Sequence, residues 1–179
     1  MKTVPKTVWL KLVMIIVAIL LLSFAAYAVL HELGHLIVVY GLGGKVTNVA
    51  LFEQNDRMVL GMTYDLTGLP GVIVGYAGGL FAAAVMLVLY FKLPGVFVRK
   101  SLGLTVMLGM AWFSFIGMGV AQGLSEGMSR QLYLNNALFD DVTIILSMVL
   151  GVVVYCRYVF VPPKGFKTKE PVGRLLFGR

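Results

Sequence analysis

Long uninterrupted apolar stretches divide the chain, and short polar segments separate them. A hydrocarbon core about 30 Å thick is crossed by roughly 20 helical residues rising 1.5 Å each. The stretches at residues 12–40, 69–91, 101–122 and 137–161 reach or approach that length. The pattern therefore predicts an all-α integral membrane protein with about four transmembrane helices.

The segment between the first and second stretches has a different pattern. Apolar residues recur at short intervals from Val46 to Leu51 and alternate with other residues from Met58 to Tyr64, with the polar run 53–57 between them. Such runs on either side of a polar turn are typical of a β-hairpin. We expect a hairpin between the first two helices.

The composition favours lipid over water as the main solvent. Hydrophobic residues make up 59% of the chain and charged residues only 13%, against roughly 25% charged in soluble domains. The net charge of +7 does not indicate a nucleic-acid partner, because the basic residues flank the apolar stretches, where they direct topology and contact anionic lipid. We expect one membrane-embedded domain, 1–161, and a basic cytoplasmic tail, 162–179.

The distribution of Lys and Arg predicts the orientation in the cell membrane. These residues lie before the first stretch, between the second and third, and after the fourth, which places both termini in the cytoplasm. Ala26-Tyr27-Ala28 could end a cleavable signal peptide. We expect the segment to be retained, because residues 12–30 already suffice to span a membrane and cleavage would leave little helix before the histidines.

The first stretch contains the motif His31-Glu32-Leu33-Gly34-His35, which holds both histidines of the chain. On a helix these imidazoles share one face, so both can bind one Zn²⁺ at about 2.0–2.1 Å. Zinc lowers the pKa of its water towards about 7, and Glu32 is placed to accept the proton. The alternative is a pair of packing or pore-lining histidines in a transporter, with Glu32 as a proton relay.

A catalytic zinc normally has three protein ligands and a water. With no histidine left and Cys156 far from the outer face, the candidates near the membrane segments are Glu126, Asp140 and Asp141. Measured from the basic residues at the cytoplasmic edge, the histidines lie about 30–36 Å along the helix, Glu126 about 39 Å, and the aspartates about 24–26 Å. This comparison favours the aspartates.

The fourth stretch supports the same choice. Its uncharged part, 142–156, is shorter than the roughly 20 residues that span a membrane, so residues at its ends must enter the bilayer. A bound metal would compensate the burial of Asp140 or Asp141. The alternative is that these acids only favour the N-terminus of a helix.

His31-Glu-Leu-Gly-His35, followed by Gly43-Gly44-Lys45-Val46, resembles the site-2 protease family of intramembrane zinc metalloproteases. In that family a β-rich loop follows the HExxH helix, then a helix with a GxxxN/S/G motif, which Gly75 and Gly79 resemble, and later a helix with an aspartate ligand. The family's Leu-Asp-Gly is replaced here by Phe139-Asp140-Asp141. By position the ligand corresponds to Asp140, with Asp141 as the alternative.

The resemblance implies a zinc endopeptidase that hydrolyses peptide bonds in or near transmembrane segments of membrane-protein substrates. It implies that Glu32 is the base and that a substrate strand pairs with the hairpin edge at 46–64. Gly75 and Gly79 would then line the substrate site, although tight helix packing also explains their spacing. The alternative function is a non-hydrolytic membrane protein, a metal or proton transporter or a scaffold, that retains a metal site.

Overall fold

The computed structural model describes residues 6–50, 61–92, 102–132 and 137–160. Its elements in chain order are α1 (Lys6–Gly41), β1 (Val46–Ala50), β2 (Gly61–Tyr64), α2 (Gly68–Lys92), α4 (Leu102–Leu132) and α5 (Ala137–Phe160). The predicted basic tail, 162–179, lies outside the described residues.

Within these residues, four helices are long and apolar enough to cross a membrane. Large hydrophobic side chains remain exposed along α1 and α5, among them Leu22 at 72% and Leu146 at 64%. Exposed apolar surface on this scale is unusual for a soluble monomer but is expected where helices face lipid. The helices confirm the predicted α-helical fold and indicate a multi-pass membrane protein.

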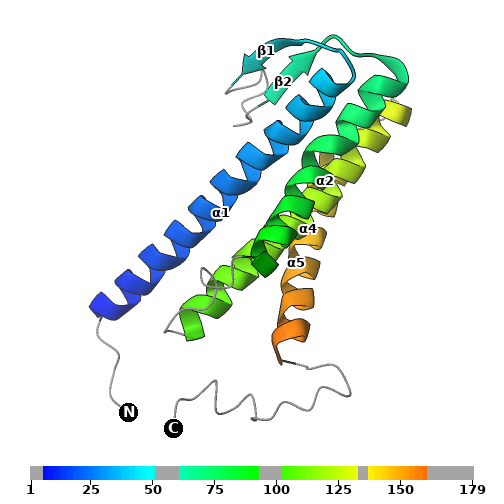
Figure 1. Ribbon diagram of the computed structural model, residues 1–179. Coiled ribbons are helices and arrows are strands. Elements are labelled where there is room, and N and C mark those ends of the chain that lie inside the picture. Colours follow the sequence, from blue (N-terminus) through cyan, green and yellow to red (C-terminus); the bar gives the residue numbers. More distant parts are fainter. Residues whose placement is uncertain (1–5, 51–60, 93–101, 133–136, 161–179) are drawn as a thin grey trace.

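Helix α2 lies between its neighbours, with α1 and α4 against it, and α5 packs against α4 (Figure 1). The N-terminal end of α1 diverges from the other helices, while its C-terminal half lies beside α2 (Figure 1). The apolar core forms where α1, α2 and α4 meet. Its buried members are Tyr27, Ala82, Met86, Phe115 and Met118.

Glycines allow the backbones of these helices to approach closely. A Cβ atom on Gly79 of α2 would collide with the backbone of Gly119 and Gly123 on α4. A Cβ on Gly34 of α1 would lie 2.8 Å from the Ala77 carbonyl oxygen and 3.1 Å from the Gly78 Cα of α2. Small residues of this kind give membrane helices their packing energy, since lipid is as apolar as the side chains themselves.

The hairpin that the sequence predicts is present where the structure describes it. Strands β1 and β2 pair antiparallel from Val46 opposite Tyr64 to Ala50 opposite Gly61, with an irregularity between Val46 and Asn48. Residues 51–60 lie outside the described part. Helix α1 ends just before β1, where Gly43 adopts a φ of +76° that favours glycine. The hairpin therefore lies at the C-terminal end of α1 (Figure 1).

The third membrane helix is longer than the sequence pattern predicts. The apolar stretch was expected to end at residue 122, but α4 continues to Leu132. The extra residues include several polar ones, but Leu, Glu, Met, Arg and Gln among them are good helix formers, so the helix does not stop where its apolar run stops. As a result Glu126 lies within α4 and not in a loop beyond it.

Gly79→Ala should weaken the contact between α2 and α4, because the added methyl meets backbone atoms that cannot rotate aside. We expect a loss of about 1–3 kcal/mol and a lower midpoint of thermal unfolding in detergent. Gly103→Ala is the matched control on α4, since nothing lies within 4 Å of its Cβ position. Equal melting of both variants and the wild type would contradict the proposed role of this contact.

Candidate metal centre

The two histidines of the motif lie on one face of α1, as the spacing predicts. Both are buried, each with 6% of its surface exposed. Their Nε2 atoms are 3.0 Å apart, and the ring centroids are separated by 4.7 Å with the planes nearly perpendicular. The Nε2 atoms therefore converge on one place in the protein interior.

The position of the His35 ring depends on α2. A Cβ on Gly78 would overlap the imidazole, so the ring occupies space that only a glycine leaves open. The Nδ1 atom of His35 lies 2.8 Å from the carbonyl oxygen of Val74. A carbonyl oxygen only accepts hydrogen bonds, so Nδ1 carries the proton and Nε2 of the neutral ring has a free lone pair.

A carboxylate from α4 completes the group. The Oε1 atom of Glu126 is 3.5 Å from Nε2 of His31, and Oε2 is 3.3 Å from Nε2 of His35. In the part of the chain that the structure describes, His31, His35 and Glu126 form a cluster of three potential metal ligands. One donor atom from each lies within 4.8 Å of the other two. The Glu126 side chain is 30% exposed, whereas the histidine side chains are 7% and 8% exposed.

The separations agree with those around a zinc ion. Four ligands at about 2.0–2.1 Å in a tetrahedron lie about 3.3 Å from one another. The Nε2 atoms of the histidines are 3.0 Å apart, and they lie 3.5 and 3.3 Å from different oxygens of Glu126. With one oxygen of Glu126 as the ligand, the three donor atoms lie within 4.8 Å of one another. Two histidines with one glutamate are also a known ligand set of catalytic zinc, in which water takes the fourth position. The residues present therefore fit a zinc ion.

Glu32 follows His31 directly on α1 and is not part of the ligand cluster. Its Oε2 atom is buried and finds no hydrogen-bond partner among the residues that the structure describes. A buried carboxylate oxygen without a partner is costly and usually has a functional reason. This oxygen is available to accept a proton beside the cluster.

The structure changes the ranking of the third ligand. Glu126, which the helix-height comparison placed below the aspartates, is the carboxylate that lies against both histidines. Asp141 is exposed and does not belong to the cluster. The side chain of Asp140 lies outside the described part of the structure, so its role as a ligand stays a prediction.

The height comparison was wrong about Glu126 because it counted residues along straight, parallel helices from their basic ends. The position of Glu126 relative to the histidines, measured across the membrane, depends instead on the contacts between helices. His35 lies against Gly78, the next residue Gly79 lies against Gly123, and Glu126 follows Gly123 by about one helical turn. The two glycine contacts bring Glu126 to the level of the histidines.

Of the two glycines predicted to pack tightly or to line the substrate site, Gly79 makes the close contact with α4. Gly75 is buried within α2. Sequence reasoning did not single out Gly78, Gly119 or Gly123. The four-residue spacing of Gly119 and Gly123 is the same signal that identified Gly75 and Gly79, and it was available in the sequence.

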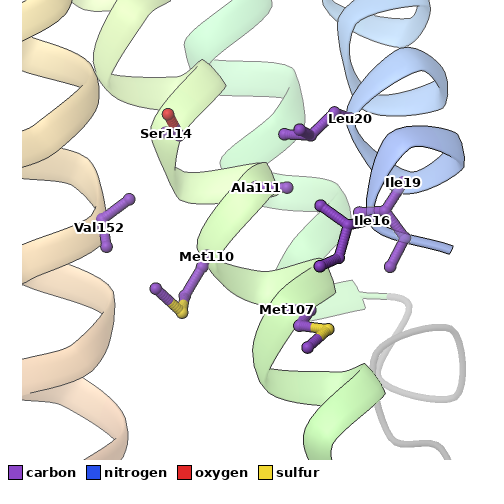
Figure 2. A pocket seen from close by; sticks show the side chains of 8 residues that line it. All are labelled: Ile16, Ile19, Leu20, Met107, Met110, Ala111, Ser114 and Val152. Carbon is purple, nitrogen blue, oxygen red and sulfur yellow. The ribbon is translucent and has the colours of Figure 1, made fainter. Parts of the chain in front are cut away.

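A separate pocket of about 230 Å³ lies between α1, α4 and α5, away from the metal ligands (Figure 2). Its lining is apolar apart from one hydroxyl: Ile16, Ile19, Leu20, Met107, Met110, Ala111, Ser114 and Val152. None of these side chains is a preferred zinc ligand. This pocket therefore contributes no ligand to the candidate metal centre.

The fold and the site together define a helical membrane protein with a cluster of two buried histidines and one partly exposed glutamate. Comparisons with protein-family models, with curated proteins and with solved structures found no match for the chain. The argument for its function therefore depends on the residues and their geometry.

Glu126→Gln should lower the affinity for zinc, because the neutral amide is a poor zinc ligand. We expect a loss greater than the roughly 10- to 100-fold that removal of an outer-shell partner causes, measured by chelator competition on the protein in detergent. Asp140→Asn and Asp141→Asn are matched controls with the same change of group. A large loss in either control, with Glu126→Gln unaffected, would restore the aspartates as ligands.

Proposed function

We propose that this protein is a zinc metalloprotease of the membrane that hydrolyses peptide bonds in or near transmembrane segments of membrane-protein substrates. The observation that carries the proposal is the convergence of His31, His35 and Glu126 beside Glu32. A structural zinc site uses four protein ligands, whereas three ligands leave a position for water or substrate. A carboxylate with an unpaired oxygen, on the residue that follows His31, is the arrangement that hydrolysis needs.

The ligands and the base have separate roles in this proposal. His31, His35 and Glu126 hold the ion, which when bound supplies a water of lowered pKa and polarises the scissile carbonyl. Glu32 accepts the proton of the attacking water and passes it to the leaving amine. The surrounding apolar helices exclude bulk water, so each charge interaction at the site is stronger than in solution.

The position of the site along α1 suits a bond close to the end of a membrane segment. His35 lies about 9 Å from the end of α1 at Gly41, which is much less than the thickness of the hydrocarbon core. Hydrolysis needs a supply of water, and the partly exposed Glu126 indicates that the site is not completely closed. A peptide bond near the hairpin end of the bilayer can meet both water and the ligands.

The hairpin can hold an extended substrate. Among the residues that the structure describes, β1 and β2 form a two-stranded sheet. Each of these strands therefore has an outer edge that is open to pairing. An added substrate strand would pair with such an edge and satisfy its own peptide groups by main-chain hydrogen bonds. We propose this pairing because β1 begins shortly after the end of the helix that carries His31 and His35.

Glu32→Gln should retain zinc and abolish cleavage of a model transmembrane substrate, because the amide keeps the size of the side chain but cannot accept the proton. We expect a loss of at least about 100-fold in rate, measured on purified protein in detergent or liposomes. Glu126→Gln is the comparison, since it should lose zinc and cleavage together. Undiminished cleavage by the Glu32→Gln variant would exclude Glu32 as the base.

Cleavage and transport assays on the wild-type protein in liposomes separate hydrolysis from the alternative of a transporter or scaffold. A wild-type protein that binds zinc but cleaves no substrate, and that moves zinc or protons across liposomes, would favour the non-hydrolytic function. Glu32 would then be a site for the transported ion or proton. The intact HExxH motif favours hydrolysis, since Glu32 occupies the position of the general base in zinc metalloproteases.

We further propose that the protein lies in the cell membrane with both termini in the cytoplasm. Reporter domains fused after residue 96 and at the C-terminus should both report a cytoplasmic location, because basic residues surround these points. A reporter inserted between residues 51 and 60 should report the opposite side. Exported signals from the first two fusions would place the metal centre near the other face of the membrane.

A further inference from the structure

Two polar side chains outside the ligand cluster connect His31 to Glu126. The hydroxyl of Tyr27 on α1 lies 3.1 Å from Nδ1 of His31 and 2.6 Å from Oε1 of Gln122 on α4. The Nε2 atom of Gln122 donates to Oε1 of Glu126 at 2.8 Å. We refer to Tyr27 and Gln122 as the hydrogen-bonded bridge.

The direction of every hydrogen bond in the bridge follows from Glu126. A carboxylate only accepts, so the amide nitrogen of Gln122 must face it, and the amide oxygen then faces Tyr27. That oxygen accepts the single proton of the Tyr27 hydroxyl. The Tyr27 oxygen can therefore offer only a lone pair to Nδ1 of His31, which must be the donor.

This direction decides which nitrogen of His31 can bind a metal. With the proton on Nδ1, Nε2 of the neutral ring has a free lone pair. The same is true of His35, whose Nδ1 donates to the Val74 carbonyl. If one of the two neutral rings instead carried its proton on Nε2, that nitrogen would donate to the Nε2 of the other ring across their 3.0 Å separation and would have no lone pair for a metal. The bridge removes that arrangement.

We propose that Tyr27 and Gln122 are positioning residues that hold His31 in its Nδ1-protonated tautomer and orient the Glu126 carboxylate, so that three lone-pair donors face one cation. The proposal rests on the proposed metal centre but not on hydrolysis. Outer-shell partners of this kind orient metal ligands and raise their affinity. The bridge is distinctive because a single chain of hydrogen bonds reaches two ligands on different helices.

The structure allows the hydrogen bond of Tyr27 to be separated from its packing. The Tyr27 ring is buried and lies 6.0 Å from the ring of Phe115, nearly parallel to it. Tyr27→Phe keeps this ring and removes only the hydroxyl. Gln122→Met removes both amide contacts with little change in length and shape. Neither substitution changes a residue of the ligand cluster.

Zinc affinity is the first measurement. Tyr27→Phe and Gln122→Met should each raise the zinc dissociation constant about 10- to 100-fold in chelator competition on the full chain in detergent. Tyr155→Phe is the matched control, because it removes another buried tyrosine hydroxyl, which donates to the Thr105 carbonyl far from the ligands. The control should bind zinc within about twofold of the wild type, a difference too small for an outer-shell partner.

The second measurement reports the tautomer directly. The chain has only two histidines, so labelling them with ¹⁵N gives a simple imidazole spectrum that Ala substitutions at His31 and His35 assign. In the zinc-loaded wild type we expect both Nδ1 atoms to be protonated. In Tyr27→Phe the Nδ1 proton of His31 should exchange faster with water, while that of His35, bonded to Val74, should not change.

The two residues should also act as one unit. If the bridge is continuous, the double variant should lose about as much zinc affinity as the weaker-binding single variant, and less than the product of the two losses. Variants that bind zinc like the wild type, or a His31 signal that Tyr27→Phe leaves unchanged, would overturn the bridge alone. A wild type that binds no zinc would overturn the metal centre together with it.

Discussion

The close contact of three helix backbones at glycine is the constraint on which the candidate site depends. Gly34 brings α1 against α2, and Gly79 brings α2 against α4 at Gly119 and Gly123. Without these contacts two histidines on α1 and a carboxylate on α4 would be separated by the width of a helix. The ligand separations of 3.0–3.5 Å are thus determined mainly by backbone packing.

The polar groups of the site form one connected system inside an apolar protein. His35 bonds to the backbone of α2, and Tyr27 and Gln122 join the other histidine to the carboxylate. A buried polar network is stabilising only when its members are satisfied, because an unpaired group in a medium of low polarity is costly. The Oε2 atom of Glu32 differs from these groups, because it is buried and has no hydrogen-bond partner among the described residues.

Local patterns in the sequence predicted the local structure. The apolar stretches, the hairpin and the shared face of His31 and His35 follow from residue spacing, and the structure agrees with each. The position of Glu126 beside the histidines could not be predicted from residue spacing, because it depends on how the tilted helices cross. That crossing is determined by glycines on two different segments, and no spacing within one segment reveals their pairing.

The bridge was missed for a related reason, although part of its signal is visible. Tyr27 precedes His31 by one four-residue step, and Gln122 precedes Glu126 by the same step, so each helix carries a polar pair on one face. Polar residues at this spacing within membrane helices commonly face the protein interior. The sequence could have indicated two polar faces, but not that they oppose each other.

The divergence of α1 has a consequence for how the molecule holds together. Its N-terminal end diverges from the bundle, and its C-terminal half lies beside α2 (Figure 1). An ion held by His31, His35 and Glu126 would join this C-terminal half of α1 directly to α4. Depletion of the metal would then loosen the first helix while α2, α4 and α5 stayed associated, and zinc supply would control the integrity of the protein as well as its chemistry.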